Sequence, residues 1–426
     1  MNALEGEVLR EIRAALAHPA AVALLIFVIY GASFWLSFGL QKQDPLTLAT
    51  IGSAFLQRGG DASPTIVASI QAHAASYTPS GVGYDGQFSY FLALDPLHAA
   101  PYLDDPALRY ARILYPLAAY ALGFGNPRLI PYTLVIVNWL AMAFGTLGAA
   151  VWLRRRNITP WLALVVGLFP GFFDSFRHDL TEPLAYALVI WGVVALGWRT
   201  PLWRYIGASA FFALAALARE ETLFISGFYI VRLAWPEIAA LRWPAIWPGL
   251  ARAGGVFVGS VGPWLLWRVV LYELFGSVVQ DAGQYLPFRA PFGGLFALWP
   301  TITTQGVESQ VFFVAIPGAV VAIAAIAALI SSRAAWKPAT FALAFNALYL
   351  CVFLAPQSFE NYLSAGRIQG GIVVAAFFAL PVLDRVWRKS RAWFWMANAL
   401  WLVPLWTVLV YPVVNDYLNY AHILHR

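Results

Sequence analysis

One carboxylate in this sequence stands among aromatic and apolar residues, in the segment Tyr84-Asp85-Gly86-Gln87-Phe88. An acid in such surroundings loses part of its hydration, which raises its proton affinity and suits Asp85 to act as a general base. The alternative interpretation is that Asp85 only caps the helix that is expected to begin at Gln87. Tyr84 and Gln87 flank this acid and are candidates for binding or orienting a substrate.

Two arginines follow in the same part of the chain. Asp104 or Asp105, with Pro106 behind it, predicts the start of a helix, and Arg109 and Arg112 then lie on one face of that helix. Two guanidinium groups beside each other can hold a phosphate through paired hydrogen bonds. The alternative is that both side chains extend to lipid headgroups and need no ligand.

A third group of ionisable residues stands between two apolar stretches and contains His178, Asp179 and Glu182. Charged groups in such a position are costly unless they pair or face a cavity. The alternative account is that the two acids are stabilised by the dipole at the N-terminus of the next helix. No second histidine follows His178 at a spacing typical of zinc ligands, so no metal site is predicted there.

Two further positions complete the candidate set. The triplet Arg219-Glu220-Glu221 divides a long apolar run, which predicts the surface turn of a helical hairpin. Arg367 precedes another apolar segment, at the end where helix orientation alone does not require a basic residue. Since these separated segments all bring ionisable groups to one face of the molecule, we expect a polar cavity walled by apolar helices.

The elements that must position these residues are strongly apolar. Of the 426 residues 61% are hydrophobic and 11% are charged, whereas soluble domains carry about 25% charged residues. Such a chain cannot cover a water-facing surface, so a lipid bilayer is the expected partner. The net charge is +6, but the basic residues stand in small groups between apolar stretches rather than in one long run. This distribution is typical of cytoplasmic loops and argues against nucleic acid as a partner.

The expected fold class is therefore all-α, a polytopic transmembrane bundle of about eleven spans by the length rule of about 20 apolar residues per span. Segment 109–124 decides the orientation: if it lies on the outer surface without crossing, the basic loops all become cytoplasmic. The expected spans are 20–40, 129–152, 160–176, 180–197, 203–218, 221–235, 252–271, 308–330, 338–355, 366–384 and 393–412.

The domain organisation follows from these spans. Residues 1–19 are expected to form a cytoplasmic amphipathic N-terminus, and residues 413–426 an external tail. The range 20–412 forms one transmembrane domain that includes external loops 41–128 and 272–307, the first of which carries surface helices. The expected location is the cytoplasmic (inner) membrane, with the N-terminus inside and the candidate residues on the extracytoplasmic side.

Several of these segments, taken in order, resemble motifs of the GT-C superfamily of membrane glycosyltransferases, especially its GPI mannosyltransferase branch and bacterial relatives. The layout of a first span, a long external loop and then short-looped spans is also similar, over nearly the whole chain. Tyr84 stands where that branch has tryptophan, and no Asp-x-Asp pair follows, which leaves the sugar open. The matching segments are Tyr84-Asp85-Gly86-Gln87-Phe88 through Ala93-Leu94-Asp95-Pro96, Phe169-Pro170 to Thr181-Glu182-Pro183-Leu184, and Leu217-Ala218-Arg219-Glu220.

The resemblance implies a GT-C-like fold and transfer of a sugar from a polyprenyl-phosphate donor to a glycan, lipid or protein acceptor, with Asp85 as the catalytic carboxylate. The cations expected at the donor phosphate are Arg109, Arg112, Arg219 and Arg367. The residues expected to bind or orient substrate are Tyr84, Gln87, His178, Asp179, Glu182 and Glu220. A divalent cation, Mg²⁺ or Mn²⁺, is left open as a cofactor, with no residue assigned to it. The alternatives are a membrane transporter or lipid-linked sugar flippase, and a non-catalytic subunit of a cell-envelope assembly complex.

Overall fold

The computed structural model describes residues 18–239, 243–276, 317–353 and 366–386. Within these residues the chain is helical, and a single bridge between Ile51 and Gly83 is the only β-type pairing. The expected all-α class is therefore confirmed for the described part of the chain. The chain divides into two compact units, of which the first comprises Met1–Gly167, Phe176–Ser226 and Trp247–Asp281, and the second Leu168–Ser175, Gly227–Ile246 and Ala282–Arg426.

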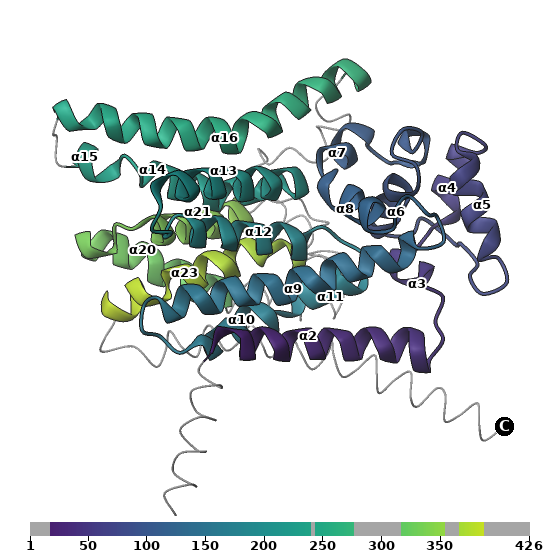
Figure 1. Cartoon of the computed structure of the whole chain (residues 1–426), viewed down its shortest axis with the longest axis horizontal. Coiled ribbons are helices and arrows are strands. Elements are labelled where there is room, and N and C mark those ends of the chain that lie inside the picture. Colours follow the sequence, from purple (N-terminus) through teal and green to yellow (C-terminus); the bar gives the residue numbers. More distant parts are fainter. Residues whose placement is uncertain (1–17, 240–242, 277–316, 354–365, 387–426) are drawn as a thin grey trace, which may run out of the picture. The chain divides into compact units, whose positions relative to one another are not determined.

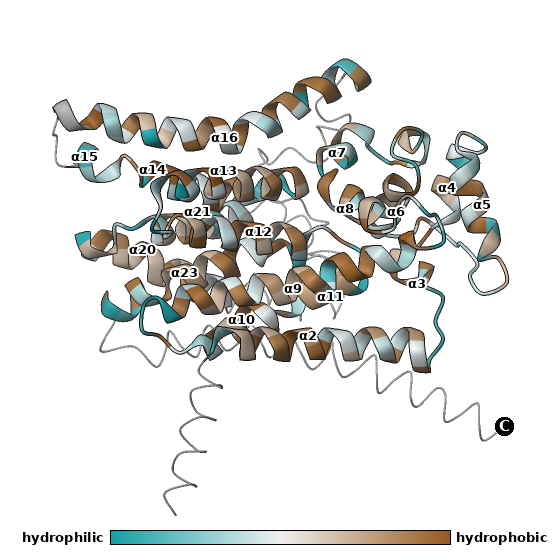
Figure 2. Cartoon of the chain, viewed as in Figure 1, coloured by the Kyte–Doolittle hydropathy of each residue, from teal (hydrophilic) through white to brown (hydrophobic). Residues whose placement is uncertain are grey.

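Long apolar helices form the body of the first unit (Figure 1). Helix α2 (Pro19–Trp35) continues into the π-helical turn η1 (Leu36–Leu40) and packs against α9 (Ile130–Arg154). Helix α9 in turn packs against α12 (Glu182–Ala195), which packs against α13 (Pro201–Ala218). Helix α16 (Trp243–Phe275) is the longest of the set. Brown and pale residues dominate these helices in Figure 2, as expected for surfaces in contact with lipid or with each other.

Small residues allow α9 and α12 to approach closely. A Cβ on Gly145 would lie 3.0 Å from the Cα of Ala187, and one on Gly148 would lie 2.9 Å from the indole nitrogen of Trp191. Without a hydrophobic force between helices in lipid, such close backbone contact is a main source of attraction. The glycines of α9 therefore fix the distance to the helix that carries Glu182.

Among the described residues, four helices are long and apolar enough to cross a membrane: Pro19–Leu40, Ile130–Arg154, Pro201–Ala218 and Ile246–Phe275. Other expected spans are shorter or interrupted. Segment 160–176 is divided into η3 (Pro160–Ala163), α10 (Leu164–Gly167) and α11 (Pro170–Arg177). Pro170 has no N–H to continue a preceding helix, which accounts for the interruption. The count of eleven spans stays a prediction.

Segment 221–235 is also divided into shorter helices. It contains η4 (Glu220–Thr222), α14 (Leu223–Val231) and the beginning of α15 (Trp235–Ala239). Several expected features lie outside the described residues: nearly all of the N-terminal segment 1–19, most of the loop 272–307, the span 393–412 and the tail 413–426.

The loop 41–128 is folded into short packed helices. Segment 109–124 holds the end of α7 and the nine-residue helix α8; nine residues span about 13 Å, too short for a hydrocarbon core of about 30 Å. It therefore contains no spanning helix. The helices of the loop are α3 (Leu46–Ala49), α4 (Ser53–Gly59), α5 (Pro64–Ala72), α6 (Gly86–Leu94), η2 (Ala100–Tyr102), α7 (Pro106–Ala111) and α8 (Leu114–Leu122).

Helix α6 is the core of this loop. All nine of its residues are buried, and it packs against α3, α8 and α9. Hydrogen bonds to two acids hold the helices around it. Asp44 accepts from the backbone N–H of Leu46 and from Ser76, and Asp95 accepts from the Ser63 hydroxyl at 2.8 Å. The loop is thus a small helical subdomain that presents the N-terminus of α6.

The described helices of the second unit pack against one another. Helix α20 (Pro317–Ser331) contacts α21 (Pro338–Phe353), and both contact α23 (Gly370–Val386). The turn η7 (Arg333–Ala335) connects α20 to α21.

Candidate functional site

Backbone pairing fixes the turn that carries Asp85. The N–H of Tyr84 donates to the carbonyl of Thr50 at 2.9 Å, beside the bridge between Ile51 and Gly83. Gly83 has a φ of +73°, and a Cβ there would lie 2.5 Å from the nitrogen of Gly52. Only glycine meets both requirements without strain, so the residue just before the Tyr-Asp-Gly motif is determined by the turn.

Gln87 holds both sides of this turn with one amide. Its Oε1 accepts from the N–H of Gly52 at 3.0 Å, and its Nε2 donates to the carbonyl of Val82 at 2.9 Å. The residue is 1% exposed. With both ends of the amide bonded to backbone, Gln87 orients the start of α6, and its expected role of binding or orienting substrate stays a prediction.

Gly86 brings the same turn against the connection between α11 and α12. A Cβ at Gly86 would overlap the carbonyl oxygen of His178 and would lie 3.1 Å from the carbonyl oxygen of Ala49. The ring of Tyr84 also meets the imidazole of His178 edge-on, with centroids 5.7 Å apart. Two motifs that are more than 90 positions apart in the sequence therefore touch through backbone and rings.

Asp85 occupies the N-cap position of α6, but its side chain makes no capping hydrogen bond. Its Oδ1 instead accepts from Nη2 of Arg109 at 2.9 Å, and the side chain is 23% exposed. The side chain of Asp85 therefore does not cap α6. The carboxylate has a partner of opposite charge at this position.

Arg109 is shared between two carboxylates. Besides Asp85, it binds Asp104 in bidentate fashion, with Nε to Oδ1 and Nη2 to Oδ2 both at 2.7 Å. Its guanidinium also lies 4.2 Å above the centre of the Phe88 ring. Burial alone would lower the pKa of Arg109, but the two carboxylates raise it above its usual value. The neighbouring acid, Asp105, is the N-cap of α7 and accepts from the N–H of Leu108.

Arg112, at the end of α7, joins this loop to the turn after α13. Its Nη2 and Nε bind the two carboxylate oxygens of Glu220 at 2.6 and 3.1 Å. Burial alone would raise the pKa of Glu220, but the Arg112 guanidinium lowers it to about 2. Both side chains keep some exposure, 16% for Arg112 and 30% for Glu220, so a ligand can reach this pair.

Arg219 forms the most deeply buried pair of the set. Its Nη1 lies 2.9 Å from Oε1 of Glu182, which is 1% exposed, and its Nε donates to Glu221 at 2.8 Å. Burial alone would lower the pKa of Arg219, but Glu182 and Glu221 raise it well above its usual value. Glu182 is in the first turn of α12, so the helix dipole and the guanidinium stabilise the same carboxylate.

Asp179 is fully buried in the turn before α12, with a φ of +50°. The hydroxyl of Tyr115 donates to its Oδ1 at 3.4 Å, and Asn138 donates to Tyr115 at 3.0 Å and to the carbonyl of Leu180 at 2.9 Å. Burial raises the pKa of Asp179 well above its usual value, although the bond from Tyr115 lowers it slightly. The neutral acid is therefore favoured at this position.

These contacts form one continuous set inside the first unit, which we call the acid–guanidinium cluster. It contains three guanidinium groups and five carboxylates, so the carboxylates are in excess. Ion pairs join the members into three groups. The backbone links these groups, because Arg109 and Arg112 both lie at the end of α7 and because Arg219 and Glu220 are neighbours in the sequence. The members are Asp85, Asp104, Arg109, Arg112, Glu182, Arg219, Glu220 and Glu221.

Sequence reasoning missed three residues here. The sequence predicts Asp104 only as a helix cap, and it predicts Glu221 only as part of a surface turn. Arg268 of α16 was not considered; its Nη1 lies 3.4 Å from the carbonyl of Ala107, while the adjacent Trp267 donates to the carbonyl of Tyr110 at 2.7 Å. A charged residue inside an apolar helix is itself a signal of function and would have identified Arg268.

Arg367 belongs to the second unit, so its role at a donor phosphate stays a prediction. Among the residues that the structure describes, no group of three or more His, Cys, Asp or Glu side chains is arranged to hold a metal ion. No family model matches the sequence, and no curated protein and no solved structure matches it either.

Proposed function

We propose that this protein is an integral membrane glycosyltransferase that moves a sugar from a polyprenyl-phosphate donor to an acceptor hydroxyl. The observation that carries the proposal is the acid–guanidinium cluster, in which a partly exposed Asp85 is bound to Arg109 beside further guanidinium groups. Such a transfer needs a carboxylate that takes a proton and cations that stabilise a leaving phosphate. Both kinds of group meet here, from segments that span residues 85 to 221.

The proposed reaction is a single displacement with inversion. The Asp85 carboxylate takes the proton of the acceptor hydroxyl while that oxygen forms a bond to the anomeric carbon of the sugar. The bond between the anomeric carbon and the phosphate oxygen breaks, and the lipid phosphate leaves with the electron pair. Arg109 fixes the direction of the Asp85 carboxylate, because Asp104 holds the same guanidinium through a bidentate contact.

Arg112 is the best placed of the expected phosphate-binding residues in the cluster. It is more exposed than Arg109 and Arg219, and its one carboxylate partner, Glu220, is also partly exposed. A donor phosphate would take the place of Glu220 at this guanidinium. Glu220 would then be released to bind a hydroxyl of the sugar or of the acceptor, in agreement with its expected role.

Buried pairs around these two residues have a positioning role in the proposal. Arg219 with Glu182 fixes the turn after α13 to the start of α12, and Glu220 is the residue next to Arg219. Gly86 and His178 fix α6 to the same region. A divalent cation, Mg²⁺ or Mn²⁺, stays open as a cofactor of the proposal, with no residue assigned to it.

The membrane setting belongs to the proposal as well. The sorting of basic residues predicts that the cluster faces the extracytoplasmic side of the inner membrane. The GT-C-like arrangement with about eleven spans is proposed on the same basis. The acceptor is a glycan, a lipid or a protein.

The test uses the purified full chain in liposomes with radiolabelled polyprenyl-phosphate sugars. Asp85→Asn should lower transfer by about 10²–10⁴-fold, the usual contribution of a general base, at temperatures at which thermal unfolding shows the variant to be folded. Asp61→Asn, an exposed acid in the same loop, is the matched control and should retain activity. Transfer by Asp85→Asn at the wild-type rate would contradict the proposal. Movement of the lipid-linked sugar across the bilayer without transfer would favour the flippase alternative instead.

A further inference from the structure

The second unit contains a cavity of about 180 Å³ that is separate in the fold from the acid–guanidinium cluster. Its walls come from two places in the sequence, the end of α14 with the start of α15, and the end of η7 with the start of α21. We call it the aromatic–basic pocket. It is lined by Phe228, Val231, Arg232, Trp235, Trp336, Lys337, Pro338 and Phe341.

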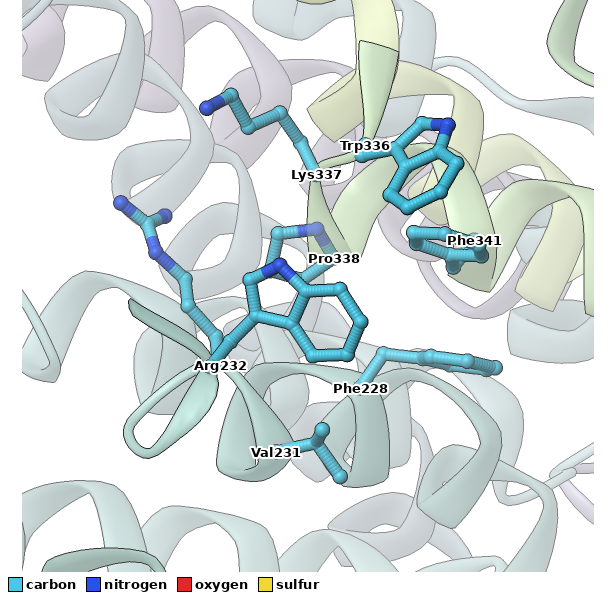
Figure 3. A pocket seen from close by; sticks show the side chains of 8 residues that line it. Phe228, Val231, Arg232, Trp336, Lys337, Pro338 and Phe341 are labelled. Atoms are coloured by element: carbon cyan, nitrogen blue, oxygen red, sulfur yellow. The ribbon is translucent and has the colours of Figure 1, made fainter. Parts of the chain in front are cut away.

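The lining divides into an aromatic side and a cationic side (Figure 3). The rings of Phe228 and Phe341 lie nearly parallel, with centroids 6.3 Å apart and an interplanar angle of 11°. Trp336 meets Phe341 edge-on at 6.5 Å and is held by a hydrogen bond from its indole to the carbonyl of Leu329 at 2.9 Å. Arg232 and Lys337 extend their cationic ends to the side away from these rings (Figure 3).

The two cations differ from those of the acid–guanidinium cluster. Arg109, Arg112 and Arg219 each bind a carboxylate, whereas neither Arg232 nor Lys337 forms an ion pair within the described ranges of the chain. The eight lining residues include no acid, and both cations are exposed. Two unneutralised positive charges beside an apolar floor complement a ligand with an anionic head and an apolar tail.

We propose that the aromatic–basic pocket binds an anionic phospholipid of the bilayer. The lipid phosphate lies between the Arg232 guanidinium and the Lys337 ammonium, and the first part of an acyl chain lies on the rings of Phe228 and Phe341. Basic pockets between membrane helices hold anionic headgroups in this way, and tryptophans favour the depth at which headgroup meets acyl chain. From the distribution of basic residues, Arg232 and Lys337 are expected on the cytoplasmic side, where anionic lipids are concentrated. The inference is independent of the proposed glycosyl transfer.

Native mass spectrometry of the purified full chain in detergent tests this proposal, with phosphatidylglycerol and phosphatidylcholine as probes at equal concentration. Each neutralised cation should weaken phosphatidylglycerol binding about fivefold, and Arg232→Gln with Lys337→Gln together about 30-fold, from a contribution of about 1 kcal/mol for each basic residue. Arg333→Gln removes the same charge from an exposed neighbour outside the pocket and should bind like the wild type.

Three outcomes would overturn the inference. The first is unchanged phosphatidylglycerol binding in the double variant, and the second is equal binding of phosphatidylcholine by the wild type. The third is displacement of the lipid by soluble glycerol phosphate at equal concentration, since that would assign the site to a free phosphate ester. Thermal unfolding of the double variant should match that of Arg333→Gln, so that loss of binding is separated from loss of folding.

Discussion

Gly86→Ala tests whether close backbone contact positions Asp85. The added methyl group would overlap the carbonyl oxygen of His178 and would lie 3.1 Å from that of Ala49. Both neighbours are backbone atoms, so neither can rotate away as a side chain would. Overpacking of this kind costs about 1–3 kcal/mol, and relief of the overlap requires α6 to move away from the connection between α11 and α12.

The matched control is Gly254→Ala in α16, where an added Cβ meets no atom within 4 Å. The chemical change is identical, but here it should stabilise the helix by up to about 1 kcal/mol, the difference in helix propensity between alanine and glycine. Thermal unfolding in detergent should therefore shift downward for Gly86→Ala and not for Gly254→Ala.

The same pair of variants should differ in transfer activity. A displacement of about 1 Å can cost about 10²-fold in rate, so Gly86→Ala should lose activity even at temperatures where it is fully folded. Activity and unfolding temperature equal to the wild type in Gly86→Ala would refute the argument, since α6 would then not depend on this contact.

Two ion pairs of the cluster give further predictions. Glu182→Gln leaves the buried Arg219 with Glu221 as its remaining ion-pair partner. Loss of a buried partner that leaves a charge unpaired costs about 3–5 kcal/mol, so with Glu221 still in place we expect a smaller loss, measured by thermal unfolding against Asp61→Asn. An unchanged unfolding temperature would contradict the buried pair. The lowered pKa of Glu220, about 2 against a usual 4.5, stabilises the fold above pH 4.5, and this stability is lost as the pH falls from 4.5 toward 2. Because the Glu220 side chain is 30% exposed, we expect a modest loss of about 1–2 kcal/mol in the free energy of unfolding. This loss should be absent in Glu220→Gln. An identical acid dependence of the wild type and Glu220→Gln would disprove the assignment.

Features set by local physics were predictable from the sequence. Asp105 followed by Pro106 begins α7 as expected, because an acid at the N-cap and a proline in the first turn stabilise that helix end. Helix α13 ends at Ala218, directly before the three charges that predicted a turn. The all-α class of the described residues was predictable because the chain is rich in apolar residues and poor in charged ones.

Features set by long-range packing were not predictable in the same way. Arg109 and Arg112 share a helix, yet they bind different carboxylates, Asp85 with Asp104 in one case and Glu220 in the other. Nothing in the spacing of the two arginines distinguishes these partners, because the choice depends on where α13 ends relative to α7. Hydropathy likewise could not show that the run 160–176 is divided before Pro170, whereas α16 continues through Pro248 and Pro263.

The amide of Gln87 has a consequence for how the loop 41–128 opens. This single side chain joins the backbone at Gly52 and Val82 to α6, so neither segment can separate from α6 without the loss of a hydrogen bond. Local unfolding here would therefore expose Asp85 in the same event that releases the bridge between Ile51 and Gly83. Motion that breaks either end of this amide is therefore coupled to the position of Asp85, which lies two residues before Gln87.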